Sequence, residues 1–239
     1  NIYSEETIEE FRTKKVNDVF RKIILSDNYI SDNFHNYILK TFINPVEKNH
    51  YIVLAVFSGD TEALIPEEEL KDLYQVLDTI DAVVLPGGTT WYEIDELIIQ
   101  YFIEHDKPLL GICLGMQALG KICLQKVKTV EDPTIKNETK IEHNQIDVDE
   151  VHSVTIKPNT KLHAIVSQDK IIVNSRHNYH IPEIEEKYIS ARSEDGLIEG
   201  IEIPNKKFIM GLQWHPELLY GKNIFATKII DAFVAAIQL

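Results

Sequence analysis

The chain has 239 residues, of which 44% are hydrophobic, and a formal net charge of −14. A chain of this length and apolar content can bury one large core. The negative charge argues against a nucleic-acid-binding protein, because a phosphate-binding surface needs clustered Lys and Arg. No apolar run approaches the roughly 18 residues of a membrane-spanning helix, so we expect no contact with a membrane.

The chain has two cysteines, Cys113 and Cys123. Two cysteines do not make a disulfide framework, and free thiols are typical of a reducing compartment. The first residues are polar and lack the apolar core of a signal peptide. We therefore expect a cytoplasmic protein in which Cys123 is a core residue.

Residues 1–124 alternate between predicted helices and apolar strands. Helices are predicted at 4–19, 32–43, 49–58, 67–77, 94–105 and 114–124, and strands at 21–27, 61–65, 82–85 and 109–112. The run 52–57 also fits a strand by its periodicity, but Gly59 fits a helix end and favours a helix there. Strands that alternate with helices imply a parallel sheet covered on both faces.

The remaining residues have shorter apolar segments. Residues 126–149 are polar and charged and are predicted to form a loop. Short strands are predicted at 151–156, 171–173, 189–191, 197–203 and 208–212, and a final amphipathic helix at 224–237. The turn residues between these strands indicate a small antiparallel addition to the sheet. No repeat or linker marks a second domain, so residues 1–239 are predicted to form one α/β domain.

Cys113 lies between Gly111 and Gly115, directly after a predicted strand. This is the cysteine form of the G-x-S-x-G turn, which raises a nucleophile between a strand and a helix. Small neighbours let the strand and the helix pack closely, and the positive end of the helix favours a thiolate. We interpret Cys113 as a nucleophile; the alternative is a buried structural cysteine.

His215 and Glu217 follow later in the chain as His-Pro-Glu. A thiol nucleophile needs a base and an acid, and histidine titrates in the right range for both. Pro216 favours extended backbone at His215, where residues two apart share a face. Glu217 can therefore orient the imidazole as the third member of a Cys113–His215–Glu217 triad. Taken alone, a histidine before a proline is more often a surface loop residue.

Three motifs in this order resemble those of the class I glutamine amidotransferase superfamily. They are Pro-Gly-Gly at 86–88, Gly-Ile-Cys-Leu-Gly-Met-Gln at 111–117 and Gln-Trp-His-Pro-Glu at 213–217. Residues 173–177 and 191–202 resemble the γ-glutamyl hydrolase branch, which includes γ-glutamyl-γ-aminobutyrate hydrolases. The resemblance covers roughly residues 50–239, matches 1–50 only loosely, and implies a flavodoxin-like three-layer sandwich.

The resemblance also implies roles for residues around Cys113. The oxyanion donors are expected to be the backbone amides of Gly88 and Leu114, since a glycine turn after a strand can present its N–H groups to developing charge. Without Cys113, an ordinary Pro-Gly-Gly turn is the better interpretation. Gln117, one helical turn after Cys113, and His177 are candidates for contact with the substrate, although Gln117 fits a merely packed residue almost as well.

No metal or other cofactor is expected. His177 and His180 are spaced so that both could be ligands, but no third ligand is evident and thiol catalysis needs none. The expected reaction is acyl transfer through a γ-glutamyl thioester, in which Cys113 attacks a γ-glutamyl amide or glutamine and water releases glutamate. This describes a cysteine-dependent hydrolase that acts on a small molecule.

Several alternatives remain open at this point. Thr89 and Thr90 stand where the hydrolase branch usually has an acidic residue, and Leu114 stands where that branch usually has arginine and is closer to the biosynthetic amidotransferases. The chain could therefore be a glutaminase subunit that supplies ammonia to a partner synthetase. A non-catalytic binding protein on the same scaffold and a peptidase are further alternatives. A homodimer is possible with any of these functions.

Overall fold

A computed structural model of the chain describes residues 20–27, 50–57, 74, 77–78, 80–88, 93–125 and 135–237. Within these residues, nine strands form one sheet in the order β2-β1-β3-β4-β11-β10-β9-β6-β7, and two more form a small second sheet. The strands of the large sheet are β1 (Phe20–Asp27), β2 (His50–Phe57), β3 (Ala82–Leu85), β4 (Leu109–Ile112), β6 (His152–Ile156), β7 (Lys170–Val173), β9 (Ile189–Ser193), β10 (Ile198–Glu202) and β11 (Ile209–Leu212). The small sheet pairs β5 (Ile135–Lys136) with β8 (Tyr179–His180).

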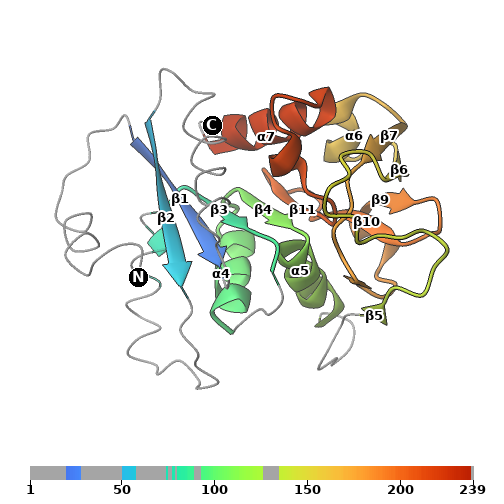
Figure 1. The fold of residues 1–239 in the computed structure, drawn as a ribbon. Helices are drawn as coiled ribbons and strands as arrows, with labels where there is room; N and C mark the ends of the chain where they lie inside the picture. Colours follow the sequence, from blue (N-terminus) through green and yellow to red (C-terminus); the bar gives the residue numbers. More distant parts are fainter. Residues whose placement is uncertain are drawn as a thin grey trace.

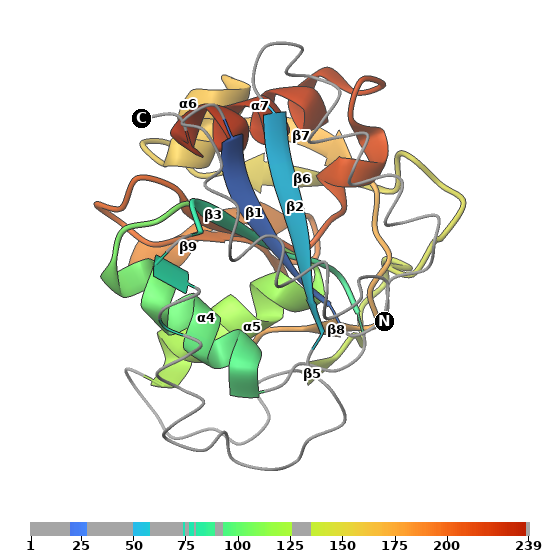
Figure 2. The same ribbon diagram turned by 90° about the vertical axis from the view of Figure 1, so that its left-hand side faces the viewer.

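Helices cover both faces of the large sheet (Figures 1 and 2). On one face lie α4 (Glu93–Glu104) and α5 (Leu114–Gln125), and on the other α6 (Lys161–Val166) and α7 (Ile224–Ile237). The side chains of β3 alternate between the two layers: Val83 packs with the α4–α5 core and Val84 with the α6–α7 core. Such alternation is what a strand buried on both faces requires. The predicted flavodoxin-like three-layer fold is confirmed.

The sheet has a parallel part and an antiparallel part. The pairings β2–β1, β1–β3, β3–β4 and β4–β11 are parallel, whereas β11–β10, β10–β9, β9–β6 and β6–β7 are antiparallel. The antiparallel part continues the same sheet. It therefore extends the sheet by as many pairings as the parallel part has.

Most predicted elements within the described residues agree with the structure to within two residues. They are the strands at 21–27, 82–85, 109–112, 151–156, 171–173, 189–191, 197–203 and 208–212 and the helices at 94–105, 114–124 and 224–237. The predicted elements at 4–19, 32–43 and 61–65 lie outside the described residues, as does most of 67–77. Residues 126–134 of the predicted loop also lie outside them.

The prediction of a helix at 49–58 is wrong, because this segment forms β2. It pairs in parallel with β1 along its whole length, from Phe20 opposite His50 to Asp27 opposite Phe57. A short continuous apolar run fits a buried strand or a buried helix equally by periodicity. Pairing with β1 selects the strand, and no local sequence pattern predicts that pairing.

Helix α6 was not predicted from the sequence. Its first turn is held by side chains: the Oγ1 of Thr160 accepts a hydrogen bond from the N–H of His163, and the carboxylate of Glu202 accepts from the N–H groups of Lys161 and Leu162. Helices this short depend on such caps, because their own hydrogen bonds barely offset the cost of nucleation. Glu202 lies on β10, so the cap is a tertiary contact.

Three neighbouring parallel strands, β3, β4 and β11, end at the same edge of the sheet. Leu85 at the end of β3 lies opposite Gly111 of β4, and Ile112 at the end of β4 lies opposite Leu212 of β11. The residues after these strands include Gly87, Cys113 and His215. Functional groups gather in such a position in open parallel sheets, just beyond the carboxyl ends of the strands.

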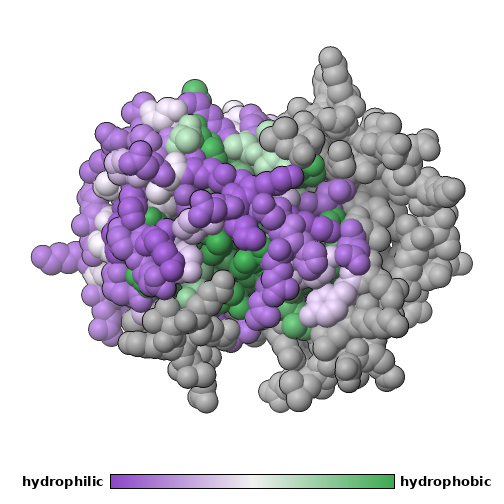
Figure 3. Space-filling view, turned by 180° about the vertical axis from the view of Figure 1, so that it is seen from behind, coloured by the Kyte–Doolittle hydropathy of each residue, from purple (hydrophilic) through white to green (hydrophobic). Residues whose placement is uncertain are grey.

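The surface of the described residues is mainly hydrophilic on the side shown in Figure 3, with apolar residues grouped near its centre. The described helices include none that is long and apolar enough to cross a membrane.

Candidate active site

Cys113 occupies a strained turn between β4 and α5. Its φ of 51° lies in the left-handed region that residues other than glycine rarely adopt. The turn is held by the N–H of Cys113, which donates to the carbonyl of Leu212 at 2.8 Å, and by the N–H of Gln117, which donates to the carbonyl of Cys113 at 3.1 Å. Strain of this kind persists where the surroundings fix the backbone, and it is frequent at functional sites.

The two glycines beside Cys113 are required by close backbone contacts. A Cβ on Gly115 would lie 2.2 Å from the carbonyl oxygen of Leu85, and a Cβ on Gly111 would lie 2.6 Å from the carbonyl oxygen of Gly115. No side chain fits at either distance. The sequence pattern around Cys113 therefore follows from how tightly β3, β4 and α5 approach one another.

We expect Gly115→Ala to lower the free energy of unfolding by at least about 2 kcal/mol, because the new methyl group would displace the backbone of β3. Gly120→Ala is the control, since it lies in the same helix and the nearest atoms to its Cβ would belong to the side chain of Ile181, not to the backbone. Its cost should stay within about 1 kcal/mol, because alanine is the better helix former. Chemical denaturation measures both, and equal stabilities would contradict the packing argument.

His215 and Glu217 form a buried ion pair. The Nδ1 of His215 lies 2.7 Å from the Oε1 of Glu217, whose side chain is fully buried. Burial, the largest single influence, lowers the pKa of His215, but the charge of Glu217 and the side chain of Cys113 outweigh it and raise the pKa to about 10. The imidazole is therefore charged at neutral pH, with its Nδ1–H donated to Glu217.

The raised pKa of His215 predicts a pH dependence of stability. A folded-state pKa of about 10, above the ordinary 6.5, makes a stabilising contribution that is complete below pH 6.5 and is lost as the pH rises toward 10. We expect the free energy of unfolding to fall across this range more steeply than in the double variant His215→Gln, Glu217→Gln. Denaturant titrations at a series of pH values measure the difference, and parallel curves would contradict it.

Gly87 lies where Cys113 and His215 approach each other. A Cβ on Gly87 would lie 2.8 Å from the Cε1 of His215, 3.6 Å from its Nε2 and 3.4 Å from the Cβ of Cys113. Apart from Cys113, the buried Nε2 of His215 has no partner among the described residues. The structure thus brings together Cys113, His215 and Glu217, the three residues of the predicted triad.

Asn174 holds the backbone of His215 and was missed in the sequence. Its Nδ2 donates to the carbonyl of His215, and its Oδ1 accepts from the N–H of His215, both at 2.9 Å. Asn174 is fully buried. It lies in the Val-Asn-Ser-Arg-His segment, which was singled out for the resemblance but not for this contact.

We expect Asn174→Ala to lower kcat for the reaction proposed below by about 10- to 100-fold, because His215 loses its backbone anchor. Asn174→Asp should lower kcat at least as much, since it sets a buried carboxylate oxygen against the carbonyl of His215 where the N–H donor was. Asn178→Ala is the control, because Asn178 is exposed in the same segment. An unchanged kcat in both Asn174 variants would show that this anchor is dispensable.

Gly88 and Leu114 lie next to each other beside Cys113. A Cβ on Gly88 would lie 3.1 Å from the Cδ2 of Leu114, and Leu114 is the first residue of α5. The first N–H groups of a helix have no partner within the helix. This arrangement suits the predicted oxyanion donors.

The two predicted substrate contacts are engaged within the protein. The Nε2 of Gln117 donates to the carbonyl of Tyr179 at 2.9 Å and to the Oε1 of Gln213 at 3.2 Å. The Nδ1 of His177 donates to the same carbonyl of Tyr179 at 3.0 Å, and its Nε2 lies 3.4 Å from the Oε1 of Glu199. Both nitrogens of His177 are therefore directed at groups other than Cys113, His215 and Glu217.

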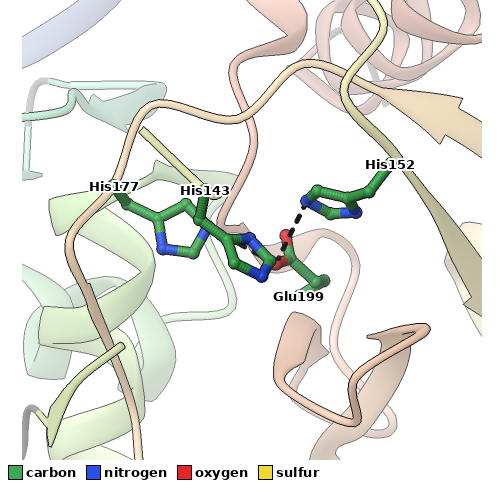
Figure 4. A group of neighbouring side chains, drawn as sticks. All are labelled: His143, His152, His177 and Glu199. Atoms are coloured by element: carbon green, nitrogen blue, oxygen red, sulfur yellow. Dashed lines mark ion pairs between the residues drawn. The ribbon is translucent and has the colours of Figure 1, made fainter. Parts of the chain in front are cut away.

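His177 belongs to a second buried group with His143, His152 and Glu199 (Figure 4). These residues come from four segments of the chain, and His143 and His152 were not connected with His177 in the sequence. His180, the other histidine considered there, contacts the Oδ1 of Asn137 and is not part of the group. Burial is the main influence on the pKa of His152 and lowers it, which favours a neutral ring.

A family model described as Peptidase C26 matches residues 90–217. The glutamine amidotransferase-like protein RP404 of Rickettsia prowazekii is 27% identical over 237 residues, which cover 74% of this chain and 84% of that protein. CTP synthase of Sulfurisphaera tokodaii is 31% identical over 218 residues, which cover 81% of this chain and 39% of the synthase. The chain therefore spans less than half the length of this synthase.

The fold has a counterpart among solved structures. The glutaminase domain of Trypanosoma brucei CTPS with bound acivicin is similar with a TM-score of 0.67 at 16% identity, over 90% of this chain and 94% of that domain. The family match includes Cys113, His215 and Glu217 and extends over more than half of the chain. The chain belongs to the Peptidase C26 family of class I glutamine amidotransferase-like proteins.

Proposed function

We propose that the chain hydrolyses the γ-amide bond of glutamine or of a small γ-glutamyl amide through a thioester on Cys113. The observation that carries this proposal is the placement of Cys113 in a left-handed turn, facing a His215 ring that is paired with buried Glu217. A thiolate beside an imidazolium is an activated nucleophile. This arrangement supports Cys113 as the nucleophile, His215 as the acid and Glu217 as the group that orients the acid.

In the first half of the reaction, the Sγ of Cys113 forms a bond to the γ-carbonyl carbon. The carbonyl oxygen becomes an oxyanion, which accepts hydrogen bonds from the backbone N–H groups of Gly88 and Leu114. The Nε2–H of His215 then protonates the leaving nitrogen as the C–N bond breaks. Ammonia or an amine departs, and the γ-glutamyl group remains on sulfur as a thioester.

In the second half, water replaces the amine. Neutral His215 takes a proton from the attacking water, whose oxygen bonds to the thioester carbon. The C–S bond then breaks, glutamate leaves, and the thiolate of Cys113 again faces the protonated ring. Glu217 keeps the Nδ1–H of His215 oriented in both halves, as the carboxylate of a catalytic triad does.

The leaving group distinguishes two forms of this function. A γ-glutamyl hydrolase would release an amine from a γ-glutamyl compound without help. The similarity to CTP synthases, of which the chain spans less than half, favours a glutaminase unit that delivers ammonia to a synthetase. In that form the chain would turn over slowly without its partner.

The test is the release of glutamate and amine from a panel of substrates. The panel contains glutamine, γ-glutamyl-γ-aminobutyrate, γ-glutamyl polyamines and γ-glutamyl amino acids, each with the unsubstituted chain and with Cys113→Ala. Turnover of a γ-glutamyl amide that needs Cys113 supports the independent hydrolase, and slow turnover of glutamine alone supports the glutaminase unit. Release that is unchanged in Cys113→Ala would contradict both forms.

A further inference from the structure

The group formed by His143, His152, His177 and Glu199 has no role in the proposed reaction. All four side chains are buried, and one potential ligand atom from each lies within 4.8 Å of those from the other three. The Oε1 of Glu199 lies 3.6 Å from the Nδ1 of His143, 3.7 Å from the Nε2 of His152 and 3.4 Å from the Nε2 of His177. Figure 4 shows the three rings around this carboxylate.

Each ring has an oxygen acceptor on the side away from Glu199, and at the Nδ1 of His177 this acceptor (3.0 Å) lies closer than the amide Nδ2 of Asn137 (3.3 Å). His143 donates its Nε2–H to the Oδ2 of Asp195 at 2.9 Å, and His152 and His177 donate their Nδ1–H to backbone carbonyls at 3.3 Å and 3.0 Å. Carboxylates and carbonyls only accept, so when a ring is neutral its other nitrogen carries a lone pair. All three lone pairs face Glu199.

This arrangement places acceptors against acceptors. The Nε2 atoms of His152 and His177 and both carboxylate oxygens of Glu199 have no hydrogen-bond partner among the described residues. The Oγ of Ser175 lies 3.2 Å from the Nδ1 of His143 and provides one donor. Buried polar groups without donors are costly, and a buried carboxylate more than most. A cation at the centre would satisfy all four ligand atoms at once.

We infer that His143, His152, His177 and Glu199 bind one divalent transition-metal cation, with Zn²⁺ as the first candidate. Three imidazoles and one carboxylate are typical ligands of borderline cations, whereas Mg²⁺ and Ca²⁺ prefer oxygen. Ligands about 2.1 Å from a tetrahedral Zn²⁺ are about 3.4 Å apart. The three separations from Glu199 are close to this value, whereas the widest separation in the group, which is within 4.8 Å, requires the rings to move inward when the cation binds. The outer hydrogen bonds of the rings are those that orient metal-binding histidines.

The site would be structural, because all four ligands come from the protein and are buried. It would join His143 of the long loop, His152 of β6 and His177 before β8 to Glu199 of β10. The carbonyl of Tyr179 accepts from both His177 and Gln117, and the N–H of Gln213 donates to the carbonyl of Glu199 at 2.8 Å. The cation would thus fix the part of the chain that lies against the residues around Cys113. The inference does not depend on the proposed hydrolysis.

The test is a metal titration of the Cys113→Ala protein after removal of bound metal with a chelator. Removing the thiol excludes binding of metal by Cys113 and His215. We expect one equivalent of Co²⁺ to bind with the visible absorption of a four-coordinate site and no thiolate charge-transfer band, and Zn²⁺ to displace it. We also expect Zn²⁺ to raise the Tm. The inference is overturned if Zn²⁺, Co²⁺, Mn²⁺ and Ni²⁺ all fail to bind at one equivalent per chain.

Glu199→Gln tests whether Glu199 binds a metal or is only a packed carboxylate, because glutamine has nearly the same shape as glutamate. The variant should bind Zn²⁺ roughly 100-fold more weakly. Without metal its Tm should be higher than that of the Glu199 protein, since the amide N–H can donate to a ring lone pair. With Zn²⁺ present, the Glu199 protein should have the higher Tm of the two. His163→Gln is the control, because His163 pairs with exposed Asp169 outside the group. Equal binding by Glu199→Gln and the Glu199 protein would overturn the inference.

Discussion

Cys113→Ala should lower kcat/KM for γ-glutamyl amide hydrolysis by about 10,000-fold or more, because no thioester can form without the sulfur. The fold should tolerate the change, since alanine removes one atom and leaves the hydrogen bonds of the turn intact. The strained φ of 51° remains in the variant. Glutamate release under saturating and limiting substrate gives kcat and KM, and thermal unfolding reports the fold.

Cys123→Ala is the matched control. Cys123 lies on α5, the helix that follows Cys113, and is 2% exposed, so both variants remove a buried thiol. Its activity should stay within about threefold of the unsubstituted chain, because the residue lies in the core. A comparable loss in both variants would mean that activity follows the packing of α5 and not the chemistry of Cys113.

Glu217→Gln should lower kcat by about 1,000-fold, because the carboxylate both orients the His215 ring and stabilises its charged form. The charge of Glu217 is the foremost influence that raises the pKa of His215 to about 10. Removing it leaves the effect of burial, which lowers the pKa. The ring of the variant should therefore lose its proton at a lower pH than in the unsubstituted chain, and NMR titration of the ring protons measures that shift.

Glu150→Gln is the control for this change, because Glu150 is exposed and the substitution removes the same charge from the surface. Its kcat and the titration of His215 should be unchanged. The account of the ion pair fails if Glu217→Gln leaves the pKa of His215 where it was.

The fold was predictable where local pattern and burial agree. The runs at 82–85 and 109–112 are short, apolar and followed by turn residues, and both are buried strands. The prediction for 49–58 was wrong because its apolar run fits a helix and a strand equally well, and only the pairing with β1 selects the strand. Helix α6 was missed although Thr160 caps it locally, because the rest of its first turn is held by Glu202, forty residues away along the chain.

The site was predictable to the extent that its chemistry lies in short motifs. The glycines around Cys113 indicate that β3 and α5 approach closely. The His-Pro-Glu spacing predicts the contact between His215 and Glu217. The anchor at Asn174 gave no such signal, since it pairs with the backbone of a distant residue. His143, His152 and His177 come from separate segments that only the tertiary fold brings together around Glu199 of β10, so no spacing in the chain indicates their proximity.

Labelling with acivicin followed by peptide mapping tests the central claim most directly. The account predicts one adduct per chain, on Cys113 and not on Cys123, formed more slowly when glutamine is present and absent in Cys113→Ala. This result holds whether the chain acts alone or with a synthetase, because it reports the nucleophile and not the leaving group. A chain with intact fold and a free Cys113 thiol that forms no adduct, or one labelled equally on Cys123, would contradict it.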